Sequence, residues 1–145
     1  MTSIIKGIES QEQARQTLLK AVAGEGNGYI AISRTTDANW KNLTTSYYAA
    51  NDLEKVFDAV EMINADQQVM FGLGRRKYVL SSASRGGNRD ICAFSIIGMD
   101  IDLYDPAKPH KNLPRTKQEA LELLNSFALP PSMVVDSGSG LHSYV

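Results

Sequence analysis

Cysteine, histidine and long apolar runs are scarce in this sequence, and each scarcity excludes a class of protein. The 145 residues include one cysteine and two histidines. One cysteine, Cys92, excludes a disulfide within the chain, and this set cannot build the usual four-ligand zinc site. No apolar stretch approaches the length that spans a bilayer, and the first residues form no signal-peptide pattern. The sequence therefore predicts a cytoplasmic protein away from membranes, with Cys92 as a buried thiol in a reducing setting.

Excess charge of one sign is also missing. The formal net charge is −1, so any binding to nucleic acid needs a local basic patch and not the charge of the whole molecule. Hydrophobic residues make up 43% and charged residues 21%, which is typical of a globular chain long enough for a real core. No repeat or linker is visible, so residues 1–145 are expected to form one domain with no internal boundary.

Hydrophobic periodicity predicts helices alternating with strands. The order favours an α/β or α+β domain in which helices pack on a mixed, largely antiparallel sheet. Helices are expected over residues 10–22, 51–63 and 116–127, and strands over residues 29–33, 68–73, 91–103, 133–136 and 141–145.

The stretch IIGMDIDLYD, Ile96–Asp105, carries two aspartates in an apolar run. On a strand, side chains alternate between faces, so Asp100 and Asp102 share one face and their apolar neighbours the other. Two adjacent carboxylates repel each other, and a hard divalent cation between them relieves that repulsion. The pattern alone also fits carboxylates that simply face water or cap the next element.

A basic, glycine-bearing segment, GRRKYVLSSASRGGNRD, lies upstream over residues 74–90. Backbone N–H groups and guanidinium groups in such a segment can bind phosphates. A solvated loop whose charges maintain solubility is the alternative. The candidate phosphate or template contacts are Arg75, Arg76, Arg85 and Arg89.

A second informative stretch is DSGSGLHSY, Asp136–Tyr144. Its glycines and serines allow a sharp turn that brings N–H groups close to an anion, and His142 follows on the emerging strand. The turn lacks the GK[ST] ending of a P-loop. A serine hydrolase built from Ser137 or Ser139 with His142 is disfavoured, because the residues are close in sequence and no nucleophile elbow is present.

Together these motifs resemble the archaeo-eukaryotic primase superfamily, and most closely the primase-polymerase domains of phages, plasmids and other mobile elements. The strand-borne DxD is matched by Asp100 and Asp102, and the following short motif by Gly140–His142. The segment Phe71–Arg76 is similar in style to the segment before the family's metal strand. The resemblance covers Gln68–Tyr144.

The resemblance implies an RRM-like core in which the acidic strand and the histidine strand are neighbours. It implies that Asp100 and Asp102 hold Mg²⁺ or Mn²⁺ and that His142 completes the catalytic set by binding the phosphates of the incoming nucleotide. The turn would add backbone N–H groups at the nucleotide-binding residues Ser137, Gly138, Ser139 and Gly140.

The activity implied is that of a DNA primase/polymerase, a nucleotidyltransferase that adds nucleotides to a 3′-hydroxyl. Its partners would be a DNA template, nucleoside triphosphates and a fused or separate replicative helicase. The family's third acidic residue lies further downstream, and substitution by Asp105 or Asp136 is disfavoured, so these residues are expected to be the front part of a longer protein. The alternatives are a non-catalytic replication-initiator or DNA-binding module and a metal-dependent nuclease.

Overall fold

The computed structural model describes residues 11–37, 41–63, 66–107, 112–136 and 139–145. Its contacts divide the chain into two compact units, which we call the N-terminal unit (Ser10–Ser95) and the C-terminal unit (Ile96–Val145). Each unit has a sheet of its own. The single domain expected over residues 1–145 stays a prediction.

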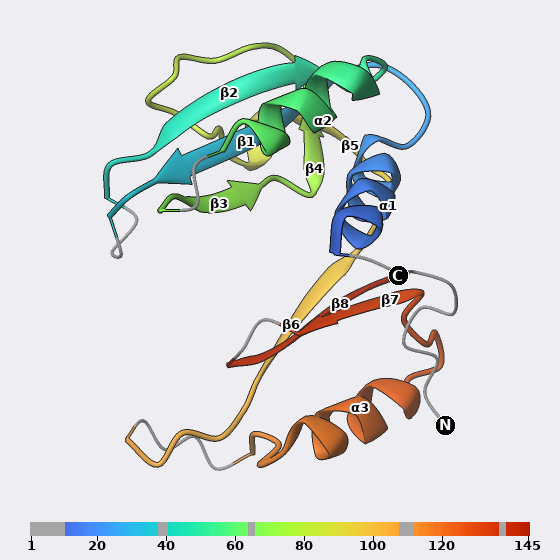
Figure 1. Ribbon diagram of the computed structural model, residues 1–145. Coiled ribbons are helices and arrows are strands. Elements are labelled where there is room, and N and C mark those ends of the chain that lie inside the picture. The colour runs from blue at the N-terminus through green and yellow to red at the C-terminus, as the bar shows by residue number, and fades with distance from the viewer. Residues whose placement is uncertain (1–10, 38–40, 64–65, 108–111, 137–138) are drawn as a thin grey trace. The chain divides into compact units, whose positions relative to one another are not determined.

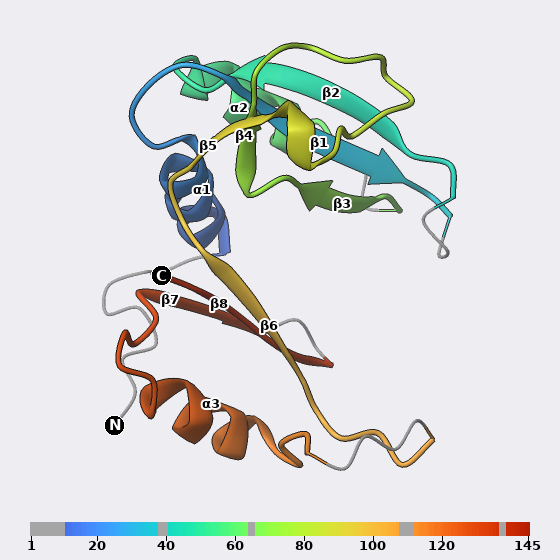
Figure 2. The same ribbon diagram turned by 180° about the vertical axis from the view of Figure 1, so that it is seen from behind.

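The N-terminal unit contains a five-stranded sheet (Figures 1 and 2). Strand β1 pairs on one side with β2 and on the other with β3 and then β4, and β4 pairs with β5; every pair is antiparallel. The strands are β1 (Tyr29–Thr35), β2 (Thr44–Ala49), β3 (Gln68–Phe71), β4 (Gly74–Arg76) and β5 (Ile91–Phe94).

Two helices complete this unit, α1 (Gln11–Ala23) and α2 (Leu53–Glu61). The sequence places the start of α2 at Asn51, but the capping side chain is that of Asp52, which accepts the backbone N–H of Lys55. The helices pack against each other, α1 against β4 and α2 against β2. The fully buried apolar side chains of this unit include Leu19, Val22, Ile30 and Val56.

Two stretches of the N-terminal unit differ from the prediction. Strand β2 was not expected, because TTSYYA has no alternation of apolar and polar residues. The basic segment begins with strand β4 and ends in a short 3₁₀-helix, Asn88–Asp90, so it is not a loop throughout. Cys92 is exposed and not buried, and its thiol contacts the carbonyl oxygen of Arg75 at 3.5 Å.

The expected strand 91–103 is divided between the units. Its first part is β5, and its second part is β6 (Gly98–Asp102) in a different sheet. Gly98 opens β6 and pairs with Tyr144.

The C-terminal unit follows the order β6, α3 (Lys117–Asn125), β7 (Met133–Asp136) and β8 (Gly140–Tyr144). Its sheet has the strand order β6-β8-β7, and both pairs are antiparallel. The last strand therefore lies between two strands that a helix connects, which is a split β-α-β arrangement. The expected mixed α+β class is confirmed, with three α-helices and two antiparallel sheets in the described residues.

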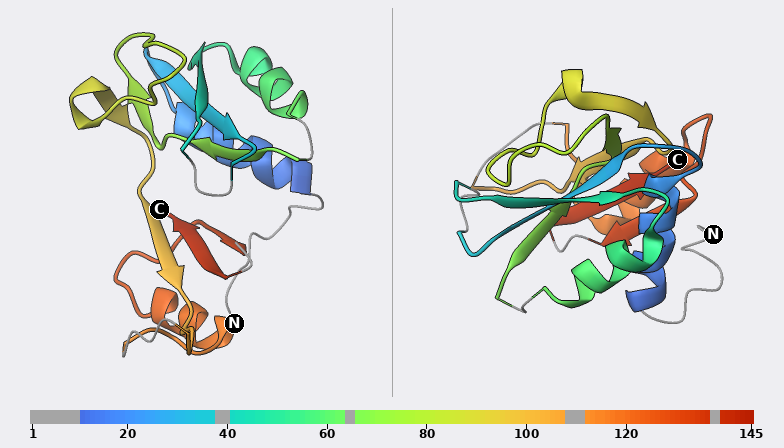
Figure 3. Two further views of the ribbon diagram at one scale, coloured as in Figure 1. Left: turned by 90° about the vertical axis from the view of Figure 1, so that its left-hand side faces the viewer. Right: turned by 90° about the horizontal axis from the view of Figure 1, so that it is seen from above.

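Helix α3 covers one face of the C-terminal sheet (Figure 3). Thr116 is its N-cap and accepts the backbone N–H of Glu119 at 3.1 Å. Ala120, Leu124 and Leu141 form the buried centre, and apolar side chains of β6 and β7 pack against them. Within the described residues, no helix is both long enough and apolar enough to cross a membrane.

Candidate functional site

The register of the C-terminal sheet brings the acidic strand and the histidine strand together. Asp100 on β6 lies directly opposite His142 on β8, and Asp102 lies opposite Gly140. The Nε2 atom of His142 is 3.5 Å from Oδ1 of Asp100, an ion pair whenever the imidazole is protonated. Asp100 and His142, 42 positions apart in the sequence, thus meet on neighbouring strands.

Both groups lie on the sheet face that α3 does not cover. Leu141 belongs to the core under α3, so His142, the next residue on β8, points to the opposite face. Asp100, its cross-strand partner, shares that face. The Asp100 side chain is 65% exposed and that of His142 43%, so a ligand can reach both.

Tyr144 belongs to the same face, and sequence reasoning did not select it as a functional residue. It lies two positions after His142 and opposite Gly98, and it is half-buried. Burial raises the pKa of the Tyr144 hydroxyl, and the negative charge of Asp100 raises it further. The two-residue spacing from His142 is the signal that could have identified it.

Gly140 allows β8 to approach β6 closely. A Cβ atom at this position would lie 2.3 Å from the carbonyl oxygen of Ile101, well inside van der Waals contact. Ser139 also joins the two strands, because its carbonyl oxygen accepts the N–H of Leu103 at 3.3 Å. Two other predicted nucleotide-binding residues, Ser137 and Gly138, lie outside the described residues.

A hollow of about 470 Å³ opens beside Asp102. Ser139 and Asp105 also line it, so the end of the acidic strand and the end of the glycine-serine turn border one space. Asp136 is placed differently. It pairs with Leu141 on the α3 face and forms a 2.6 Å ion pair with Lys117, so it cannot join Asp100 and Asp102.

The donor set on this face fits a magnesium or manganese ion only in part. Two exposed carboxylates on one strand are the oxygen ligands that Mg²⁺ prefers, and Mg²⁺ often uses one or two carboxylates together with water and substrate phosphates. In the part of the chain that the structure describes, no three acidic, histidine or cysteine side chains form a group that could hold a metal ion. A metal at Asp100 and Asp102 therefore needs further oxygen ligands from a substrate or water.

The four candidate arginines all belong to the N-terminal unit. Arg75 and Arg76 are 6% and 7% exposed. The guanidinium of Arg75 donates to the carbonyl oxygen of Glu25 at 2.9 Å, and that of Arg76 to the carbonyl oxygens of Gly74 and Arg85. These bonds hold both guanidinium groups in fixed positions. The other two, Arg85 and Arg89, are exposed.

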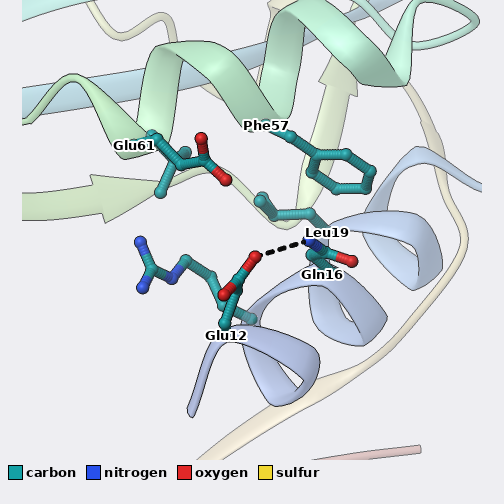
Figure 4. Close-up of a pocket in the computed structure, with 7 residues that line it drawn as sticks. Glu12, Gln16, Leu19, Phe57 and Glu61 are labelled. Carbon is teal, nitrogen blue, oxygen red and sulfur yellow. Dashed lines mark hydrogen bonds between the residues drawn. The ribbon is translucent and has the colours of Figure 1, made fainter. Parts of the chain in front are cut away.

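A further hollow lies between α1 and α2, where Leu19 and Phe57 face each other and Glu12 and Glu61 lie at the side (Figure 4). Gln16 donates its side-chain N–H to Glu12 at 3.2 Å. The volume is about 10 Å³, which is room for about one water molecule. We therefore regard it as a packing gap between the helices.

Comparison with models of known families, with curated proteins and with solved structures finds no match to this chain. The geometry of the C-terminal sheet and its motifs are therefore the observations that point to a function.

Proposed function

We propose that the protein is the metal-dependent nucleotidyltransferase part of a DNA primase/polymerase. One observation carries the proposal: the carboxylate of Asp100 and the imidazole of His142 lie 3.5 Å apart on the exposed face of neighbouring strands. Two acid groups and an imidazole on one open face suit a ligand that brings both a metal ion and phosphates.

The strand order supports the finer part of the proposal, an RRM-like core. The order strand, helix, strand, strand, with the last strand in the middle of the sheet, matches the first four elements of the six-element ferredoxin-like pattern, to which the RRM belongs. The motifs fall on the two strands that such a core places side by side. Cytoplasmic location and a helicase partner remain further parts of this proposal.

Each residue has a distinct role in the proposed reaction. Asp100 and Asp102 bind the divalent cation, which when bound neutralises charge on the reacting phosphates. His142 donates a hydrogen bond from Nε2 to a phosphate oxygen of the incoming triphosphate. Gly140 keeps β8 close to β6, and the N–H groups of the preceding turn add donors for the same phosphates.

Template-directed extension is the direct test, with template, primer, labelled nucleotide and Mn²⁺. We expect Asp100→Asn and Asp102→Asn to lower the rate by at least about 100-fold, because metal stabilisation of transferring phosphates contributes several kcal/mol. His142→Ala should chiefly weaken nucleotide binding. Asp136→Asn is the matched control, since this carboxylate lies on the opposite sheet face.

Extension at the parental rate by either aspartate variant would show that the metal assignment is wrong. Shortening of the primer would identify a nuclease that uses the same carboxylates. Binding of DNA and nucleotide without incorporation would identify a non-catalytic replication module, an alternative favoured by the absence of a three-residue metal group among the described residues.

A further inference from the structure

The N-terminal unit has a basic hollow of its own. It has a volume of about 270 Å³ and is lined by Arg76, Arg85, the Gly86–Asn88 turn and the inner strand β1 at Ser33. A water molecule in the liquid occupies about 30 Å³, so the space exceeds what a phosphate group alone requires. A phosphate with part of its attached sugar is an occupant of suitable size.

The charges around this hollow are not balanced. The buried guanidinium of Arg76 has neutral backbone carbonyls as its hydrogen-bond partners. Arg85 is exposed, and its Nη1 contacts the sulfur of Met70 at 3.3 Å, a weak acceptor that an anion readily replaces. Two guanidinium groups thus border the space, and one carboxylate, that of Asp90, lies close to Arg76.

Asp90 organises the turn and leaves the hollow open. One oxygen accepts the N–H of Gly87 at 2.7 Å and the other accepts the hydroxyl of Tyr78 at 2.9 Å. These two hydrogen bonds lower the pKa of Asp90, that of Gly87 most, and the nearby charge of Arg76 lowers it slightly further. The carboxylate therefore stays ionised and holds the turn in place.

The two glycines of the turn have different roles. Gly86 has φ +74°, and a Cβ there would lie 3.0 Å from Nε of Arg76, so only glycine lets the turn come this close to the buried guanidinium. At Gly87 a Cβ would meet nothing within 4 Å. The turn is thus closed on the Arg76 side and open on the other.

We propose that this hollow binds a nucleotide phosphate. Guanidinium groups recognise phosphate oxygens with paired hydrogen bonds, and a glycine turn lets a ligand approach the backbone closely. The source is a free nucleotide or one unit of a single-stranded nucleic acid. The site lies in the N-terminal unit and needs no metal, so it goes beyond the proposed reaction at Asp100 and His142.

Fluorescence anisotropy of the whole chain in EDTA tests the proposal, with a labelled deoxynucleoside triphosphate in one arm and a labelled oligothymidylate in the other. Chelation removes the metal-dependent site, so the result does not depend on the proposed nucleotidyltransferase. Arg85→Gln should weaken binding of the probe that resembles the natural ligand about tenfold, because a hydrogen bond to a charged group contributes an affinity in this range. Arg89→Gln, an exposed arginine of the same segment outside the hollow, should change it by less than about twofold.

Gly87→Glu gives a second variant. Gly87 has φ −125°, which any residue adopts, and its side chain would extend into open space, so the protein should fold. The added carboxylate should weaken binding at least as much as Arg85→Gln. If the two variants bind the oligothymidylate more weakly, the ligand of the hollow is a nucleic-acid strand. If they bind only the deoxynucleoside triphosphate more weakly, the ligand is a free nucleotide. Unchanged binding in both variants, equal loss in Arg89→Gln, or no binding by the unmodified chain would overturn the proposal.

Discussion

The two units present opposite charges by different structural means. In the C-terminal unit, Asp100 and His142 project from paired strands, and the hydrogen-bonded register fixes which face they occupy. In the N-terminal unit, Arg76 and Arg85 meet a glycine turn, and backbone carbonyls and the side chain of Asp90 hold the group together. Strand alternation can be seen in a sequence, whereas a loop that folds back on a strand cannot.

Substituting one glycine in each unit should give the largest difference in stability between the two units. Gly140→Ala should destabilise the C-terminal unit by about 2–3 kcal/mol, because the added methyl group lies 2.3 Å from a backbone oxygen of β6, which cannot move aside freely. Gly87→Ala in the N-terminal unit should change stability by less than about 0.5 kcal/mol, since its methyl group meets nothing.

Urea unfolding of both variants, with hydrogen exchange of the β8 amides, measures these effects. Equal stability of Gly140→Ala and the unmodified chain would show that β6 and β8 are not as close as the structure has them. A large loss in Gly87→Ala would contradict the open side of the basic turn.

Removing a helix cap in each unit should have an effect of intermediate size. Thr116→Ala removes the side chain that accepts the N–H of Glu119, and Asp52→Ala removes the one that accepts the N–H of Lys55. Thr116→Ala should cost about 1 kcal/mol, and Asp52→Ala should also destabilise its own helix. Because the caps belong to different units, hydrogen exchange should show faster opening of α3 in the first variant and of α2 in the second. Equal effects of each variant on both helices would mean that the units unfold together.

The smallest expected effect concerns alkaline pH. The pKa of Tyr144 in the C-terminal unit is raised chiefly by burial, and that of Tyr78 in the N-terminal unit chiefly by its hydrogen bond to Asp90. A raised pKa means that the folded state holds the proton more tightly. The resulting stability is complete below the ordinary tyrosine pKa of about 10 and disappears as pH rises through the higher folded value.

Tyr144→Phe should therefore lose less stability above pH of about 10 than the unmodified chain does, as measured by urea unfolding across that range. Tyr78→Phe is the matched variant in the other unit, and ultraviolet titration of each should show one high-pKa tyrosine fewer. If the tyrosine lost from the titration of Tyr144→Phe has an ordinary pKa, this hydroxyl is not half-buried beside Asp100.

Much of the fold could be predicted from local patterns, and the errors have identifiable causes. The three helices carry apolar stripes and, at Thr116, a cap, so their positions agree with prediction to within a few residues. Leu123 and Phe127 lie in the expected helix 116–127 but are 42% and 39% exposed, because the sheet contacts the face that Ala120 and Leu124 occupy. Periodicity indicates that a face is apolar but not how wide a partner covers it.

The candidate site divides in the same way. Alternation predicted that Asp100 and Asp102 share a face, and this is confirmed by the packing of Ile101 on the opposite side. The nearness of Asp100 and His142 could be expected only through the family resemblance. It depends on β8 entering between β6 and β7, which no local pattern encodes.

By itself, the sequence determined the helices, most of the strands and the side of β6 that carries its carboxylates, because these follow from the repeat of side chains along the backbone. Only the tertiary structure decided that the chain forms two units, that Asp136 turns away to Lys117, and that Arg76 lies buried under a glycine turn. Those features depend on contacts between residues distant in sequence. Such contacts form where two surfaces of the folded chain bury each other away from water.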